Sequence, residues 1–105
     1  MRSLEIIKNA LTEIHDSVHH YEAPPKEKNP YIVWAEDGAN HFQADGKNLE
    51  TAFSGTIDLF TKNEDDELLE KIPEALNETR AAWALNSVQY ESETGFIHYE
   101  WVWEV

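Results

Sequence analysis

The sequence predicts an α+β domain in which two helices cover one face of a largely antiparallel sheet of about five strands. Stretches with apolar residues three and four positions apart, one near each end of the first 80 residues, predict the helices. Stretches rich in β-branched and aromatic residues predict the strands. Their order is α-β-β-β-α-β-β. With 105 residues, the chain has the length of a single domain, residues 1–105.

The stretch at residues 96–105 gives the clearest strand pattern. Alternate positions hold Ile97, Tyr99, Trp101 and Trp103, and the positions between them are mostly polar. All four are assigned to the core. Because each aromatic side chain buries roughly 150–250 Å², Tyr99, Trp101 and Trp103 are predicted to supply much of it. The opposite face of this strand can be exposed to solvent.

The N-terminal helix is predicted to begin at Ser3, which can cap it, and to run for about four turns to residues 19–22. Pro24-Pro25 then prevents the helix from continuing. One apolar stripe, which predicts packing across a sheet, is formed by Leu4, Ile7, Leu11, Ile14 and Val18.

A weak metal-site pattern lies near the end of this predicted helix. His15 and His19 are four residues apart, which places both imidazoles on one helical face, and Glu22 lies about one turn further. These residues are candidate ligands for a divalent metal. The chain has no His-Glu-x-x-His pattern, so polar histidines without a metal are the preferred interpretation, with only weak metal binding expected.

Three strands are predicted next. The first covers residues 31–35 and is expected to stop at Glu36-Asp37-Gly38. The second covers residues 41–44 and is expected to stop at Asp45-Gly46. Asp-Gly pairs supply the positive φ that tight turns require, so this part of the chain is predicted to be a β-meander.

The third predicted strand covers residues 49–61. Phe53, Ile57 and Leu59 are assigned to its core face. Gly55 interrupts the strand, and a glycine at such a position marks a bulge or a close approach of another backbone. We therefore expect the strand to bend at Gly55.

The second helix is predicted to begin at Asn63 and to end near residues 77–80. Acidic residues suit the positive end of the helix dipole, and an acidic surface is assigned to Glu64, Asp65, Asp66 and Glu67. Leu69, Ile72 and Leu76 are assigned to the core, beside Leu68 and Ala75. Pro73 lacks a backbone donor and is expected to kink or restart the helix. A fourth strand at residues 86–91 and a turn at residues 92–95 complete a C-terminal hairpin.

The net charge of −13 argues against specific nucleic-acid binding and against anionic membranes. Residues 63–105 carry eleven acidic and two basic residues, so the acidic surface is concentrated there. The absence of cysteine suits a reducing compartment, and no apolar run predicts a signal peptide or a membrane span. We expect a soluble, cytoplasmic protein.

No motif predicts an enzyme or a bound cofactor. No serine lies in a Gly-x-Ser-x-Gly elbow, and the four glycines form no phosphate-binding loop. Adjacent carboxylates such as Asp65-Asp66 are ordinary on an acidic surface.

Four stretches together resemble the tail-terminator group of small proteins from the head–tail junction of long-tailed bacteriophages and prophages. They are Tyr31-Ile-Val-Trp34, residues 55–62, residues 71–77, and residues 85–91 with 97–101. The resemblance implies an α+β subunit that forms a ring, commonly a hexamer, which caps the finished tail tube and faces the head connector. It implies tail-tube and connector proteins as partners, assembly in the bacterial cytoplasm, and no catalysis.

An alternative function follows from the charge alone. An acidic protein can imitate the phosphate array of DNA and inhibit a nucleic-acid-binding protein. Such a mimic is expected to remain small in solution and to bind a basic partner with strongly salt-dependent affinity. A tail terminator is instead expected to associate with itself and with tail-tube protein.

Overall fold

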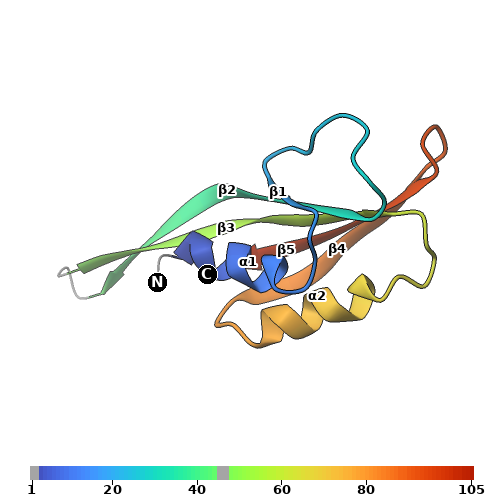
Figure 1. Cartoon of the computed structure of the whole chain (residues 1–105). Coiled ribbons are helices and arrows are strands. Elements are labelled where there is room, and N and C mark those ends of the chain that lie inside the picture. The colour runs from blue at the N-terminus through green and yellow to red at the C-terminus, as the bar shows by residue number, and fades with distance from the viewer. Residues whose placement is uncertain (1–2, 45–47) are drawn as a thin grey trace.

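The computed structural model describes residues 3–44 and 48–105 (Figure 1). The elements along the chain are α1 (Ser3–Thr12), β1 (Val18–His20), β2 (Tyr31–Ala44), β3 (Asn48–Thr61), α2 (Leu68–Asn77), β4 (Ala82–Glu91) and β5 (Phe96–Glu104). The predicted fold class and the order α-β-β-β-α-β-β are confirmed. No described helix has the length and apolar character needed to cross a membrane.

The five strands form one sheet in the order β1-β2-β3-β5-β4. β1 pairs with β2 in parallel, and the other three pairings are antiparallel. β5 lies between β3 and β4, which explains why its apolar side chains alternate so regularly: its helix-facing side is covered along the strand. The β4–β5 connection is the predicted tight turn, in which Gly95 adopts a φ of +80°.

Both helices pack on the same face of the sheet. Ile7 and Leu11 of α1 and Ile72 of α2 share one buried cluster with Ile57 of β3 and Trp101 of β5. The predicted core residues that are buried are Ile7, Leu11, Ile57, Leu59, Ile72, Leu76, Trp101 and Trp103. Those that are partly buried against the cluster are Leu4, Ile14, Phe53, Leu69 and Tyr99, whereas Ile97 is half-buried.

The N-terminal helix is shorter than predicted. It ends at Thr12, and Val18–His20 is the strand β1 instead of a fourth helical turn. Val18 pairs with Ile32 of β2, where its partly buried side chain still packs against the core. A β-branched residue can satisfy either element, so tertiary pairing decided the outcome.

The predicted first and second strands are one strand, β2. The chain passes through Glu36-Asp37-Gly38 with a register shift, so these residues form a bulge and not a turn. Gly55 faces this bulge, and a Cβ there would collide with the Ala35 carbonyl oxygen and lie 2.5 Å from Trp103 Cζ2. The expected close backbone approach at Gly55 is therefore present. The turn predicted at Asp45-Gly46 lies outside the described residues.

The second helix also starts later than predicted, at Leu68, and Asp66 does not belong to the acidic surface. Asp66 is only 8% exposed. Its Oδ1 accepts a 2.9 Å hydrogen bond from the Leu68 backbone N–H, and its Oδ2 accepts a 2.6 Å bond from Thr61 Oγ1. A carboxylate that satisfies a free N–H at a helix start is stabilising there. The helix then continues through Pro73 without the predicted restart.

β2 and β3 continue beyond the rest of the sheet. β3 has β5 as a neighbour from Ser54 to Thr61, and a backbone pair joins Phe53 to Val105. Beyond that point residues 40–44 and 48–52 pair only with each other among the described strands. This two-stranded segment, called the arm below, projects from the body and contributes to an overall length of 51 Å (Figure 1).

Candidate functional site

The face of the sheet opposite the helices carries a row of stacked rings. Tyr31, Phe60 and His98 are neighbours in register on β2, β3 and β5. The Tyr31 and Phe60 ring centroids are 4.7 Å apart, and those of Phe60 and His98 are 4.3 Å apart. Phe96 meets the Tyr31 ring edge-on. Alternation along each strand places these rings on the side that the helices leave open.

A histidine–carboxylate pair ends this row. His98 Nε2 donates a 2.7 Å hydrogen bond to Asp58 Oδ1, and Asp58 Oδ2 accepts a 3.1 Å bond from Thr56 Oγ1. The hydrogen bond to Asp58 raises the pKa of His98, partial burial opposes that shift, and the negative charges of Asp58, Glu91 and Glu100 add to it. For the neighbouring Tyr31 hydroxyl, burial has the opposite effect and raises the pKa.

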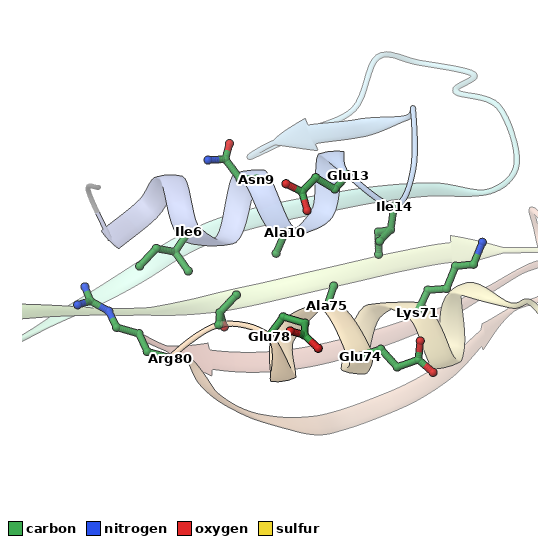
Figure 2. A pocket seen from close by; sticks show the side chains of 11 residues that line it. Ile6, Asn9, Ala10, Glu13, Ile14, Lys71, Glu74, Ala75, Glu78 and Arg80 are labelled. Atoms are coloured by element: carbon green, nitrogen blue, oxygen red, sulfur yellow. The ribbon is translucent and has the colours of Figure 1, made fainter.

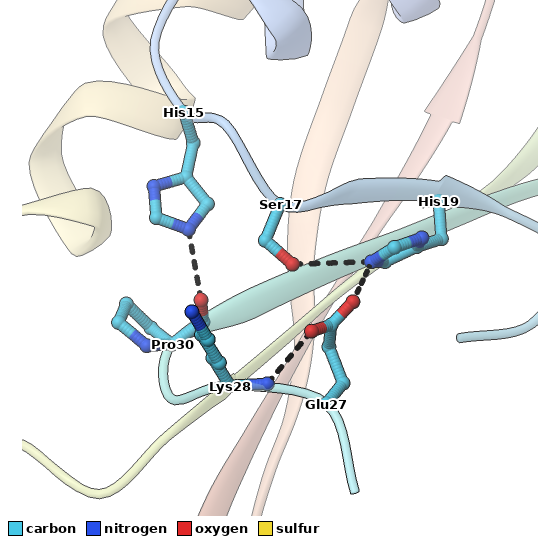
Figure 3. A network of polar contacts seen from close by, with 6 residues as sticks. All are labelled: His15, Ser17, His19, Glu27, Lys28 and Pro30. Carbon is cyan, nitrogen blue, oxygen red and sulfur yellow. Dashed lines mark hydrogen bonds and ion pairs between the residues drawn. The ribbon is translucent and has the colours of Figure 1, made fainter. Parts of the chain in front are cut away.

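The segment between β1 and β2, residues 21–30, folds over this face instead of extending away from it. Glu27 fixes the segment: its Oε2 lies 2.5 Å from His19 Nε2, and its Oε1 accepts a bond from the Lys28 backbone N–H (Figure 3). That backbone bond is the main reason why the pKa of Glu27 is lowered. His15 Nε2 donates to the Pro30 carbonyl oxygen at 2.8 Å and ties down the far end of the segment.

The near end of the segment is held by Glu36 of β2. Its two carboxylate oxygens accept 2.6 Å bonds from His20 Nε2 and from the Tyr21 hydroxyl. The His20 ring is stacked between Tyr21 and Trp34, with 3.9 Å between centroids on each side. Although burial raises it, the pKa of Glu36 is lowered overall by these hydrogen bonds.

A pocket of about 700 Å³ lies between this segment and the sheet. Its floor includes Tyr31, Phe60 and His98, with Asp58 at one side, and residues 21–27 form its opposite wall. The pocket therefore combines an aromatic floor with one polar pair, which is the usual composition of a ligand or partner site.

The predicted metal residues are not brought together. The helix that would have aligned them ends at Thr12, so His15 and His19 have separate partners, at Pro30 and at Glu27. Glu22 is exposed in the 21–30 segment. The described residues do contain another cluster of potential metal ligands, Asp58, His98 and Glu100, which the sequence did not indicate.

A second hollow of about 900 Å³ lies between the two helices (Figure 2). Its apolar part is formed by Ile6 and Ala10 of α1, by Ile14 just after α1, and by Ala75 of α2. Charged side chains surround them: Glu13, Lys71, Glu74, Glu78 and Arg80. The acidic surface predicted nearby consists of Glu64, Asp65 and Glu67, which are exposed.

The edge strand β4 exposes apolar side chains. Leu85 is 51% exposed, Val88 52% and Tyr90 68%. All three lie on the helix-facing side of the sheet, because their partners on β5 are Trp101, Tyr99 and Ile97. An exposed apolar strip on an unpaired edge strand is a feature of surfaces that pair with another chain.

Comparisons with known proteins show a likeness at the level of the fold. No protein-family model and no curated protein sequence matches the chain. The fold is similar to that of a chain in the virion of a native gene transfer agent (GTA) particle, with a TM-score of 0.54 and 8% sequence identity. The likeness covers 97% of this chain and 88% of that chain.

Proposed function

We propose that this protein is a structural subunit of a phage or phage-like particle, of the tail-terminator or head–tail joining type. In this role, copies of the chain form a ring that caps the tail tube, assembled in the bacterial cytoplasm and retained in the virion tail. Tail-tube protein and head connector proteins are its partners. The proposal assigns the chain no catalytic activity and no specific nucleic-acid binding.

The observation that carries the proposal is the fold likeness to a chain of a GTA virion, which extends over nearly the whole chain. The resemblance of residues 31–34, 55–62, 71–77, and 85–91 with 97–101 to tail terminators points to the same class of particle. Both likenesses support the class of particle. The ring and its place at the end of the tail tube are the finer part of the proposal.

Two surfaces support a role in assembly. Among the described strands, the two strands of the arm pair only with each other. An isolated two-stranded hairpin is marginally stable in water until something packs against it. The edge strand β4 presents unpaired backbone groups together with Leu85, Val88 and Tyr90. A ring supplies a neighbour for both surfaces, because each subunit in a ring offers different faces to its two neighbours.

The test is capping of tail tubes. Purified protein is added to polymerising tail-tube protein from the same phage or prophage gene cluster, and tube ends and lengths are examined by electron microscopy. We expect rings at one end of the tubes and shorter tubes as the protein concentration increases. A protein that leaves tubes unchanged and instead captures a DNA-binding protein at low salt is an acidic mimic, and that result overturns the proposal.

A further inference from the structure

Three potential metal ligands converge on the face of the sheet that the helices do not cover. Asp58 of β3 and Glu100 of β5 are directly opposite each other in the antiparallel register. His98 lies two residues before Glu100 on β5 and therefore points to the same face. One ligand atom from each of the three side chains lies within 4.8 Å of the other two.

These ligands are held in place by contacts outside the cluster. Thr56 Oγ1 donates to Asp58, and the Phe60 ring stacks on His98. Asn86 Nδ2 donates a 2.8 Å bond to Glu100 Oε1, from the position where the β4–β5 register shifts. Such outer contacts fix the orientation of metal ligands and strengthen their binding. The three ligands are also half-buried, which limits competition from solvent.

The arrangement has an electrostatic cost that a cation removes. Two carboxylates directly opposite each other on neighbouring strands repel and destabilise the pairing. Neither carboxylate is paired with a Lys or Arg in the ion pairs described. Asp58 is paired with His98, and Glu100 accepts a hydrogen bond from the Asn86 side-chain amide. A divalent ion between the two strands balances both carboxylates at once.

We propose that Asp58, His98 and Glu100 bind one divalent first-row transition-metal ion that clamps β3 to β5. One imidazole with two carboxylates is a donor set for ions such as Zn²⁺. Around a metal with ligand bonds of about 2.0–2.2 Å, the His98–Asp58 contact of 2.7 Å opens slightly to admit the ion. Three protein ligands leave a fourth position of a tetrahedral shell for water or a partner's group, reached from the pocket, which Asp58 and His98 both line.

The site is independent of the proposed assembly role, so its test uses the isolated protein. Untagged protein is stripped with a chelator and titrated with Zn²⁺ by isothermal titration calorimetry. We expect one ion per chain, a dissociation constant in the micromolar range or below, and a higher melting temperature with Zn²⁺. In NMR spectra of the unmodified protein, the imidazole signals of His98 are expected to shift, while those of His15, His19 and His20 remain.

The variants Asp58→Asn, His98→Gln and Glu100→Gln are each expected to weaken Zn²⁺ binding at least tenfold. The matched control is His19→Gln, which removes an imidazole that also contacts a carboxylate but lies outside the cluster. Circular dichroism of the metal-free variants shows whether each one is folded, and the NMR readout does not depend on any variant. The proposal is overturned if His98 signals do not move, if binding survives Asp58→Asn with Glu100→Gln, or if His19→Gln abolishes binding.

Discussion

Histidine residues take part in most of the ion pairs described for this chain. Three ion pairs among the described residues join a histidine to a carboxylate: His19 to Glu27, His20 to Glu36, and His98 to Asp58. The chain has 21 acidic residues and only eight Lys and Arg, so histidine is a ready source of N–H donors for its carboxylates. A histidine changes its charge near neutral pH, and the raised pKa of His98 makes its contact with Asp58 sensitive to pH.

His98 is expected to show this sensitivity in the metal-free protein. Its folded-state pKa is raised above the ordinary value of 6.5, so the contact with Asp58 stabilises the fold fully below that pH and less as pH rises through the folded-state pKa. NMR titration of the His98 ring is expected to give a pKa above 6.5. Urea unfolding is expected to show the matching loss of stability above that pH. In the Asp58→Asn variant, the His98 pKa should move back toward its ordinary value, and the loss of stability with pH should become smaller. An unchanged His98 pKa in that variant would show that Asp58 does not cause the shift.

At the scale of elements, the sequence was sufficient to predict a strand whose residues alternate regularly, such as β5. It was not sufficient to predict element ends and bulges that depend on pairing with a distant strand. β5 was correct because one of its faces is buried by Trp101 and Trp103, which fixes a period of two. The end of α1 was wrong because Val18 continues a helical stripe and also suits a strand, and its partner Ile32 lies far along the chain. The same reason explains β2, whose bulge at Glu36-Asp37-Gly38 needs the opposing β3 to be recognised.

The candidate site was beyond sequence reasoning for a similar reason. Alternation does place His98 and Glu100 on the polar face of β5, and Asp58 on that of β3. Only the register shows that Asp58 faces Glu100, and the register is set by contacts some forty residues apart. The pair His15 and His19 was instead chosen from helical spacing, which does not apply once the helix ends at Thr12.

The central position of β5 predicts a large effect of shortening its tryptophans. Trp101 and Trp103 are each 2% exposed, so Trp101→Ala and Trp103→Ala should each lower the free energy of unfolding by about 3–5 kcal/mol. Tyr90→Ala is the matched control, because this aromatic side chain is 68% exposed on the neighbouring strand. Its effect is expected to stay within roughly 1 kcal/mol. Chemical unfolding followed by circular dichroism measures all three, and equal effects would contradict the assigned core.

At the scale of the whole molecule, charge and surface act in opposite directions. A net charge of −13 makes copies of the chain repel one another. The arm and the apolar side chains of β4 gain from association, because each leaves strand edges or apolar groups without a protein neighbour among the described residues. Whether charge repulsion or the gain from association is larger depends on ionic strength. Salt screens the charges over a Debye length of about 10 Å at 0.1 M but does not weaken apolar contacts.

Self-association is therefore expected to increase with both protein concentration and salt. Size exclusion with light scattering should show larger species as NaCl is raised, reaching the full ring where tail-tube protein is present. Val88→Asp places a charge in the exposed strip of β4 and should reduce association, whereas Ser92→Asp adds the same charge in the exposed β4–β5 turn and should have little effect. If both variants lost self-association to the same extent, total charge, and not the β4 surface, would control assembly. A chain that stays monomeric at high concentration and high salt, even with tail-tube protein, would exclude a ring built through this surface.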